Sequence, residues 1–516
     1  MTSTSLMFLE SLIKKVSPPM GESANANLES GKRSLQQAQK ILQDVFGHHA
    51  FRPSQAAVIQ HVLAGEHAMV IMPTGRGKSM CFQIPALLGT DADLTLVLSP
   101  LIALMQDQVD GLVAKGIDAT LINSSLDRSE REKRQKNLRE NQYRLLYVTP
   151  ERFRKPEFLD AISGRNIQLL AIDEAHCVSQ WGHDFRPDYS RIADIRKQLG
   201  SPTTIALTAT ATAECRADIV DQIGLGKGEM RLFHEGIDRP NLRIDVQSVM
   251  GESEKFEMIL EALSAPPFLP TDDTPVGGAI IYFSLIKTLT HFSDLLLSQS
   301  IDHVCYHGDQ SRKDRRRIQN QFMSGERDLV LATPAFGMGV DKENIRLVIH
   351  AETPGSIESY YQEIGRAGRD DKPSRCLWLY DQDDLMTQMQ FIEWANPDAD
   401  FYDRLMFALE HHADRCAAYG LDWLRKELQR VSPHDHRVDT AIAMLDRHGV
   451  VAGPREPECF QLSGDLPEKF RDNEWLAEKR QRDQKRLYAM VQFAATPAEE
   501  RQAFLNRYFL DSTIVE

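Results

Sequence analysis

Short apolar runs alternate with amphipathic stretches along most of the chain from residue 35 onward. In the first half they occupy residues 69–72, 94–98, 145–148, 169–172 and 205–207, and in the second half residues 279–283, 304–306, 329–332, 347–350 and 376–380. Such runs, separated by helical periodicity, are typical of buried parallel strands joined by helical crossovers. The pattern predicts an α/β fold with two tandem parallel-sheet domains, residues 34–236 and 237–385, and a cleft between them.

The two ends of the chain depart from this pattern. Residues 1–33 are polar and contain Ser-Pro-Pro and Asn-Ala-Asn segments, which predicts a flexible leader. Beyond residue 381 the sequence becomes mostly helical. Helices at 423–430 and 435–448, followed by a hairpin within 449–462, predict a winged helix in residues 397–466. Any small helical domain with a hairpin fits the same pattern, and residues 467–516 predict a basic helical tail.

Composition narrows the class of protein only a little. At 516 residues the chain exceeds a single hydrophobic core and predicts about three or four domains. The net charge of −14 argues against a general polyanion binder, although gripping nucleic acid in a narrow cleft needs only local positive charge. No apolar run approaches the roughly 20 residues that span a bilayer, and the start lacks the order of a signal peptide. Seven cysteines without a Cys-x-x-Cys spacing predict reduced thiols in a cytoplasmic protein.

A candidate phosphate-binding loop follows the first apolar run. The loop comprises Met72, Pro73, Thr74, Gly75, Arg76, Gly77, Lys78 and Ser79, and a helical stretch follows it. In such loops backbone N–H groups cradle phosphates, the lysine reaches the terminal phosphates, and the hydroxyl binds magnesium. The strict pattern has glycine in place of Met72, so an ordinary strand-to-helix turn is the alternative.

A pair of carboxylates, Asp173 and Glu174, stands where the strand predicted at 169–172 ends. One carboxylate can hold a magnesium ion, and the other can orient or deprotonate an attacking water. An aromatic and basic loop follows directly, and it contains Trp181, Phe185 and Arg186. Phosphate chemistry and a surface that can stack a base therefore lie close together in sequence, which predicts an ATP-driven motor on nucleic acid.

The second predicted domain carries a pair of arginines. Arg366 and Arg369 lie one turn apart in residues 361–370. We expect this segment to be helical, so that both arginines lie on one face of the helix. If the two domains face each other, these arginines can neutralise the charge that develops on the γ-phosphate. Surface arginines on a helix are the alternative. The glycine-rich loop 333–341 precedes them at a predicted strand end and favours a composite site.

These features together resemble the RecQ family of superfamily two DNA helicases, over residues 42–381. The segments that carry the resemblance are 46–55, the phosphate loop, 99–108, 146–152, the box 173–176 with its loop 179–187, 208–212, 335–339 and 361–370. The loop Trp181–Pro187 distinguishes RecQ-like enzymes from RNA-directed relatives. The resemblance implies two RecA-like domains, ATP and Mg²⁺ as cofactors, and single-stranded and duplex DNA as partners.

The resemblance also implies a role for each matching residue. Arg52 and Gln55 would read the adenine, with Thr74, Gly75, Arg76 and Gly77 around the phosphates. Lys78 would bind the β- and γ-phosphates, Ser79 and Asp173 would hold magnesium, and Glu174 would be the base. Gln362, Arg366 and Arg369 would lie beside the phosphates. His176 and Gln180 would couple hydrolysis to the loop, where Trp181, Phe185 and Arg186 would touch DNA. His48 stands at a position where the family usually stacks an aromatic on the base, and Asp371 replaces a family glycine.

Phosphate contacts give a motor grip without sequence preference, and four residues at predicted strand ends are candidates for them. They are Ser99, Thr149, Arg152 and Thr333, each of which also fits a helix cap or a turn. We expect the basic cluster 312–317 to be a solvated helix face. RecQ enzymes normally carry a four-cysteine zinc platform after the motor, but Cys416 stands alone there, so we expect no structural zinc.

The sequence and the resemblance together predict an ATP-dependent DNA helicase that translocates on single-stranded DNA and acts in repair or recombination, and the resemblance implies the 3′-to-5′ direction. We expect a cytoplasmic protein, associated with the nucleoid if it is bacterial, and no membrane partner. Two alternatives remain open: an ATP-dependent translocase or remodelling protein that separates no strands, and an RNA helicase with the same core.

Overall fold

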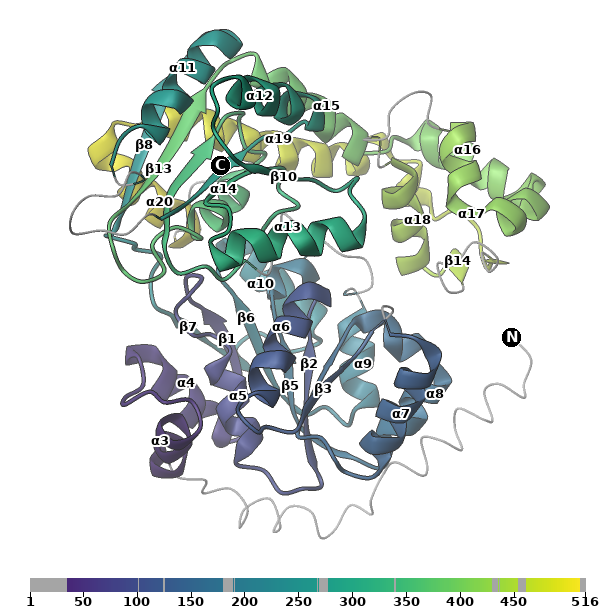
Figure 1. Ribbon diagram of the computed structural model, residues 1–516. Coiled ribbons are helices and arrows are strands. Elements are labelled where there is room, and N and C mark those ends of the chain that lie inside the picture. Colours follow the sequence, from purple (N-terminus) through teal and green to yellow (C-terminus); the bar gives the residue numbers. More distant parts are fainter. Residues whose placement is uncertain are drawn as a thin grey trace.

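The computed structural model describes residues 35–100, 102–123, 126–179, 189, 191–266, 268, 277–337, 340–428, 435, 437–452 and 461–510. Two sheet-containing units lie one above the other, and a helical module lies beside them (Figure 1). The predicted leader, residues 1–33, falls outside the described residues. No helix in the described ranges is both long and apolar enough to cross a membrane.

The first unit is a parallel sheet with the strand order β3-β4-β2-β5-β6-β1-β7. Its strands are β1 (His67–Ile71), β2 (Asp93–Leu98), β3 (Ala119–Ile122), β4 (Leu145–Val148), β5 (Asn166–Ile172), β6 (Thr203–Thr208) and β7 (Met230–His234). Alternate residues of each strand enter two separate cores, so that Ala68 and Val70 face one core while Met69 and Ile71 face the other. Both faces are covered, which explains the nearly continuous apolar strands.

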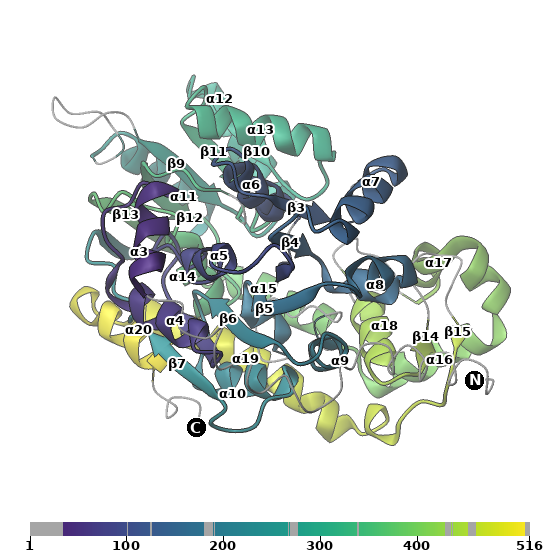
Figure 2. The ribbon, with the colours of Figure 1, turned by 90° about the horizontal axis from the view of Figure 1, so that it is seen from below.

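Helices from different parts of the chain cover the two faces of this sheet. One face is covered by α3 (Leu35–Asp44), α4 (Pro53–Leu63), α5 (Met80–Leu87) and α6 (Ile102–Val113). The other is covered by α7 (Arg128–Arg139), α8 (Pro156–Ile162), α9 (Ile192–Gln198) and α10 (Ala213–Gln222). Figure 2 shows the sheet from below, with the strands fanned between these two layers.

The second unit is a parallel sheet with the order β10-β11-β9-β12-β13-β8. Its strands are β8 (Leu242–Ser248), β9 (Gly278–Tyr282), β10 (Val304–Tyr306), β11 (Leu329–Ala332), β12 (Ile345–His350) and β13 (Ser374–Tyr380). One face is covered by α11 (Gly251–Leu263) and α12 (Ile286–Ser298), and the other by α13 (Arg312–Ser324) and α14 (Ile357–Ile364). The α/β fold class with two tandem parallel sheets is therefore confirmed.

The rest of the chain is mostly helical, as the sequence predicts. It contains α15 (Asp384–Ala395), α16 (Ala399–His411), α17 (Ala413–Leu428), α18 (Arg437–Arg447), α19 (Asn473–Ala495) and α20 (Arg501–Leu510). The strands β14 (Val451–Ala452) and β15 (Gln461–Leu462) pair antiparallel as a hairpin. We call residues 399–470 the accessory module; they share one core that is separate from both sheets.

Two of the predicted helical segments in the accessory module have different limits from those expected. The segment expected at 423–430 belongs to the longer α17, which is kinked at Gly420, where the backbone has φ 57° and ψ −144°. The second helix is shorter than expected and covers Arg437–Arg447. The assignment of this module as a winged helix stays a prediction.

An ion pair joins the accessory module to the first unit. Arg154 Nη2 donates to Asp446 Oδ2 at 2.6 Å and its Nη1 donates to Oδ1 at 3.2 Å. After the module, α19 runs back to the second unit, as Figures 1 and 2 both show. There α19 and α20 join α13 and α14 on the same face of the second sheet. The chain thus leaves the second unit, builds the module and then returns.

Candidate active site

The candidate phosphate loop lies where β1 gives way to α5. Gly75 and Gly77 adopt left-handed backbone conformations, with φ of 81° and 75°, which glycine tolerates without strain. Met72 continues the strand instead: its side chain is fully buried, and its N–H donates to the Thr208 carbonyl at 3.2 Å. A methionine at this position is therefore compatible with the loop. The helix begins at Met80, so Lys78 lies in the turn before it rather than on it.

Lys78 and Ser79 are the last two residues of this loop, and both carry polar side chains that a phosphate or a metal could use. The ammonium of Lys78 is buried, and no group within the described ranges accepts a hydrogen bond from it. Ser79 occupies the N-cap of α5, but its side chain makes no capping hydrogen bond. A buried cation without an acceptor is costly, so this position favours an anionic ligand. The adjoining helix N-terminus adds to that preference.

The carboxylates Asp173 and Glu174 directly follow β5. They lie at the same edge of the first sheet as the phosphate loop, which follows β1. Asp173 accepts a hydrogen bond from the Glu174 N–H at Oδ1, over 3.0 Å. Burial raises the pKa of Asp173 to about 7, the Glu174 carboxylate raises it too, and Lys78 lowers it. A divalent cation would offset the same burial cost, so Asp173 and the Ser79 hydroxyl fit a magnesium site. Glu174 itself has a φ of 48°, a left-handed conformation that is costly for a residue with a side chain.

A chain of side chains links this turn to β6. The buried His176 lies 3.0 Å from Thr208 Oγ1 through Nδ1, and the same nitrogen is 3.4 Å from Glu174 Oε2. Thr208 in turn donates from Oγ1 to the Thr210 carbonyl at 3.1 Å. The sequence assigned a coupling role to His176 and Gln180. Thr208 and Thr210 belong to the segment 208–212, which carries the family resemblance but received no role of its own, and we add them to the candidate site on this geometry.

The two arginines of the second unit lie after α14, not on it. The helix ends at Ile364, and residues 365–370 form successive turns, so the prediction of one helical face for Arg366 and Arg369 was wrong. Gly368, four residues beyond the end of the helix, has a φ of 57°, so a helix could not continue through this position. A methyl group at Gly368 would lie 2.4 Å from Asn241 Nδ2, so glycine is also needed there for packing.

A buried arginine that the sequence did not point to holds these turns. Arg239 donates from Nη2 to the Ala367 carbonyl at 2.8 Å and to the Gly368 carbonyl at 2.9 Å. Asn241 donates to the same Gly368 carbonyl at 2.8 Å. Both residues precede β8, far from the arginines in the chain, and no motif surrounds them.

Arg369 brings the second unit against the phosphate loop of the first. A methyl group at Gly75 would lie 3.3 Å from Arg369 Cγ, which places the two backbones across a narrow gap. Arg369 also pairs with Asp341, and its side chain is 8% exposed. Burial lowers the pKa of Arg369, and Arg366 lowers it further against the effect of Asp341. A further anion beside Arg369 would therefore be stabilising.

Further contacts surround this junction. Asp371, which replaces a family glycine, lies 3.6 Å from Arg76 of the phosphate loop. Arg366 donates to the Gly337 carbonyl, in the loop that follows β11. Gln362 lies half-buried on α14, one helical turn before Arg366. The structure therefore brings Gly75, Arg76, Lys78, Asp173, Glu174 and Arg369 to one junction of the two sheets.

Arg52 and Gln55 contact the phosphate loop from the start of α4. Arg52 Nη1 donates to the Gly75 carbonyl at 2.8 Å, and Gln55 Nε2 donates to the Gly77 carbonyl at 3.0 Å. Gln55 Oε1 accepts from the Arg52 N–H at 3.0 Å. Both side chains support the loop here, and their reading of adenine stays a prediction. The nearby His48 is exposed.

The four candidates for contact with a DNA strand lie at the carboxyl ends of three β-strands. Ser99 follows β2, Thr149 and Arg152 follow β4, and Thr333 follows β11. The Ser99 hydroxyl is buried, with no hydrogen-bond partner within the described residues. Thr149 precedes the short helix η1 (Pro150–Arg154) without capping it. Gln180, Trp181, Phe185 and Arg186 lie outside the described residues.

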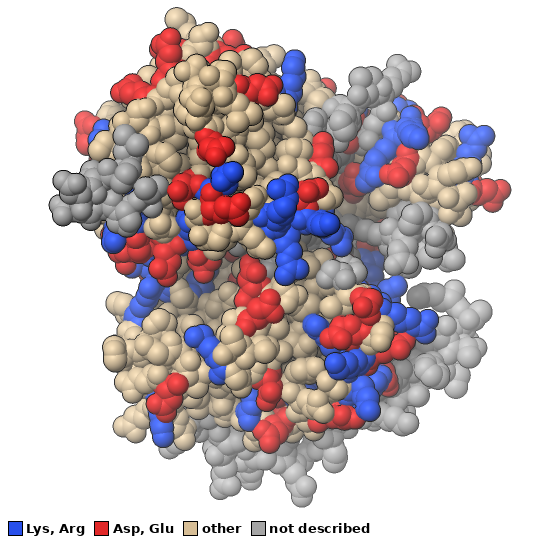
Figure 3. Space-filling view, viewed as in Figure 1, with Lys and Arg blue, Asp and Glu red and all other residues tan. Residues whose placement is uncertain are grey.

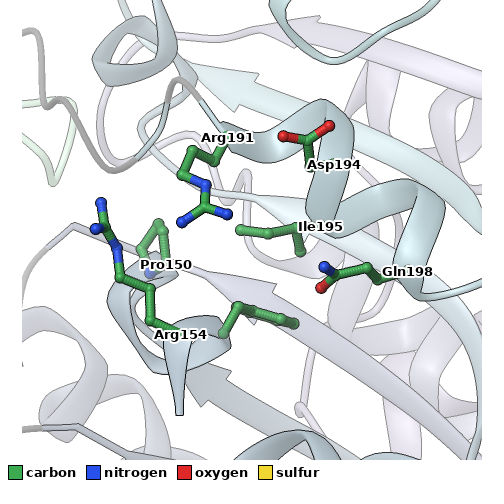
Figure 4. A pocket seen from close by; sticks show the side chains of 7 residues that line it. Pro150, Arg154, Arg191, Asp194, Ile195 and Gln198 are labelled. Atoms are coloured by element: carbon green, nitrogen blue, oxygen red, sulfur yellow. The ribbon is translucent and has the colours of Figure 1, made fainter. Parts of the chain in front are cut away.

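Basic side chains gather at two places, one on each unit. Figure 4 shows a hollow beside η1 that is lined by Pro150, Arg154, Arg191 and Asp194, among others. Figure 3 shows a second group on α13, above the junction of the units. The exposed members of that group are Arg312, Lys313, Arg316 and Arg317.

Two stacked parallel sheets, with a phosphate loop on one and arginines from the other, define a nucleotide-hydrolysing motor of the helicase class. Residues 52–218 match the model for DEAD/DEAH box helicases, and residues 254–371 match the model for the helicase conserved C-terminal domain. A crystal structure of the DUF1998 helicase MrfA bound to DNA shares the fold, with a TM-score of 0.55 at 19% identity, over 87% of this chain and 64% of that one.

Curated relatives identify the family within this class. The probable ATP-dependent DNA helicase RecS of Bacillus subtilis is 36% identical over 379 residues, 73% of this chain and 73% of that protein. The ATP-dependent DNA helicase RecQ of the same organism is 42% identical over 363 residues, 70% of this chain. The chain belongs to the RecQ family of superfamily two helicases. It spans 58% of the length of the Bacillus RecQ and 54% of that of Haemophilus influenzae RecQ.

Proposed function

We propose that this chain is an ATP-dependent DNA helicase that translocates 3′ to 5′ along single-stranded DNA and unwinds duplex. The observation that carries the proposal is the junction of the two units. There the buried ammonium of Lys78 has no acceptor within the described residues, and Arg369 packs against Gly75 of the same loop. Such an arrangement suits a triphosphate held by one unit and sensed by the other.

Each side chain at the junction has a defined task in hydrolysis. Lys78 would bind the terminal phosphates, and Arg366 and Arg369 would offset the negative charge that grows as the γ-phosphate leaves. Glu174 would take the proton from the attacking water. Arg52 and Gln55, already attached to the phosphate loop, would connect adenine recognition to the shape of that loop.

Magnesium would be held by Ser79 and Asp173, and when bound it would neutralise phosphate charge between them. The raised pKa of Asp173 supports this assignment, because a buried carboxylate of this kind gains most from a cation. No zinc is expected to be required, and metal analysis of the purified protein would test that expectation.

The single DNA strand would pass over the carboxyl ends of the β-strands in both sheets. Ser99, Thr149, Arg152 and Thr333 would contact its phosphates, and Trp181, Phe185 and Arg186 would contact the strand from their loop. His176 and Gln180 would report that contact to the site of hydrolysis. The winged helix proposed for residues 397–466 would bind duplex ahead of the motor. We place this activity in DNA repair or recombination, in the cytoplasm and at the nucleoid if the protein is bacterial.

Unwinding of tailed duplexes tests the proposal. A duplex with a 3′ single-stranded tail and one with a 5′ tail are incubated with ATP and magnesium, and strand release is measured. We expect release from the 3′-tailed duplex only. Lys78→Ala should abolish both release and ATP hydrolysis, because the terminal phosphates lose their counter-charge.

The other outcomes separate the alternative functions. DNA-stimulated hydrolysis without strand release would point to a translocase or remodelling protein. Stronger stimulation by RNA than by DNA would point to an RNA helicase. Hydrolysis that Lys78→Ala leaves unchanged would overturn the assignment of the phosphate loop.

A further inference from the structure

The two C-terminal helices lie directly behind the turn that carries the arginines. Phe493 of α19 packs on Tyr360 of α14, with ring centroids 5.5 Å apart, and Phe509 of α20 packs on Tyr361 at 5.3 Å. These aromatic side chains belong to the core of the second unit. Residues at the end of the sequence therefore complete the packing around α14.

A charged group is buried where these helices meet. Glu358 lies in the first turn of α14 and is 4% exposed. Tyr508 of α20 donates its hydroxyl to Glu358 Oε1 at 3.0 Å, and Arg486 of α19 lies 3.7 Å from the same oxygen. The start of a helix favours a carboxylate, but a buried one still needs direct partners. Within the described residues, α19 and α20 supply the partners of this carboxylate that the structure records.

The same terminal helix also reaches the first unit. Arg216 of α10 donates from Nη1 to the Phe509 carbonyl at 2.8 Å, and to the Ala211 carbonyl at 3.2 Å. Carbonyls in the last turn of a helix lack partners within the helix, so Phe509 presents a ready acceptor. α10 begins directly after Thr212, which closes the segment that His176 contacts through Thr208. The helix α20 thus contacts Arg216 in the first unit, near the candidate hydrolytic residues. It also contacts Glu358 in the second unit, on the helix that precedes Arg366 and Arg369.

We propose that Tyr508 is a positioning residue for ATP hydrolysis, acting through Glu358 and α14 on Arg366 and Arg369. α14 is a short helix, and the turn that follows its C-terminal end places Arg369 against Gly75. Tyr508 binds Glu358 at the N-terminal end of the same helix, and Arg216 links α20 to the first unit. The proposal rests on the proposed function and extends it to a residue outside the cleft.

The substitution Tyr508→Phe tests it, because the ring is kept and only the hydroxyl bond to Glu358 is removed. We expect the kcat of DNA-stimulated ATP hydrolysis to fall roughly 10-fold, as misplaced catalytic groups do, with the KM for ATP almost unchanged. Tyr488→Phe is the matched control, because Tyr488 lies on α19 and is 62% exposed. Melting temperatures of both variants check that the fold is kept.

A double-mutant cycle with Arg369→Ala distinguishes positioning from simple stabilisation. If Tyr508 acts through the arginines, Tyr508→Phe should lower kcat by a clearly smaller factor once Arg369 is removed, because only the effect through Arg366 is left. Equal losses of kcat in both backgrounds, or no loss in Tyr508→Phe alone, would overturn the proposal. Glu358→Met removes the same bond from the other side and should behave alike, which covers a poorly folded Tyr508→Phe.

The same experiment keeps the two proposals apart. Hydrolysis by the wild-type protein without strand release would remove the helicase function, and the cycle would still decide the role of Tyr508. Absence of hydrolysis in the wild type would overturn both proposals together.

Discussion

Gly337 determines how Arg366 is seated. A methyl group at this position would lie 2.7 Å from Arg366 Nη2 and 3.1 Å from the Pro334 carbonyl. The guanidinium now donates to the Gly337 carbonyl itself, so the absence of a side chain leaves room for that contact. A small residue here leaves room for an arginine that we propose to act in hydrolysis.

We therefore predict that Gly337→Ala displaces Arg366 and lowers the kcat of ATP hydrolysis by about 10- to 100-fold. Stability should change by only about 1 kcal/mol, since the crowded atom is the end of a flexible side chain. Steady-state hydrolysis and thermal melting measure the two effects. Gly308→Ala is the control, because a methyl group at Gly308 would meet nothing within 4 Å. Equal kcat values for the two variants would contradict the prediction.

The residues that sequence analysis could find are those whose chemistry follows from local order. Lys78, Ser79, Asp173 and Glu174 stand at predicted strand ends, where a few neighbouring residues define the role. Arg239 could not be found in this way. Its partner carbonyl at Gly368 lies far along the chain, and only the fold brings the two together.

At the scale of elements, the strands that the apolar pattern missed are edge strands. They are β3, β7 and β8, and each stands at the end of its sheet. Two of them, β7 and β8, are covered less completely, so polar residues interrupt their apolar runs, as Arg243 and Asp245 do in β8. β3 is buried throughout, but it is only four residues long and contains a threonine. Interior strands such as β4 and β11 were predicted with their observed limits because both of their faces are buried.

The pairing of β1 with β6 contains a titratable group, His67. His67 Nδ1 accepts from the Thr204 N–H at 3.0 Å, and its other nitrogen lies 3.1 Å from Arg196 Nη2. Burial lowers the pKa of His67, and Arg196 lowers it further, against the effects of Glu229 and Glu66. The folded protein therefore resists protonation of His67 more than the unfolded chain does.

Acid should accordingly destabilise the first unit through His67. As the pH falls below about 6.5, the unfolded chain takes up a proton that folded His67 takes up only at lower pH, so stability is lost. The variant His67→Asn keeps an acceptor for Thr204 and cannot titrate. We predict a smaller fall in melting temperature between about pH 7.5 and 5.5 for His67→Asn than for wild type. Equal falls in melting temperature would show that His67 titrates alike in both states.

At the scale of the whole molecule, an ion pair between Arg154 and Asp446 joins the accessory module to the motor. Arg154 lies two residues beyond Arg152, a candidate for contact with the strand, and it pairs with Asp446 of α18. Both side chains are mostly buried, at 16% and 15% exposed. This contact could not be predicted from the sequence, because the two residues belong to different domains and neither lies in a motif.

We predict that Asp446→Asn loosens the module from the first unit. The substitution keeps the shape but replaces an ionic hydrogen-bonded pair, which is typically worth about 1.5–3 kcal/mol. Small-angle scattering should show a larger radius of gyration, and unwinding should slow while DNA-stimulated hydrolysis is kept. Asp439→Asn breaks a pair that is internal to the module, with Arg425, and is the control. An unchanged radius in Asp446→Asn would show that other contacts hold the module.

The return of α19 and α20 to the second sheet has a consequence for biosynthesis. The last strand of that sheet ends at Tyr380, but Phe493 and Phe509, which cover Tyr360 and Tyr361, are synthesised much later. At ordinary translation rates the delay is on the order of ten seconds. During that interval the nascent chain presents an apolar surface to chaperones, and premature termination anywhere in the accessory module would leave that surface uncovered. We expect ribosome-associated chaperones to bind this nascent intermediate until residue 510 has emerged from the ribosome.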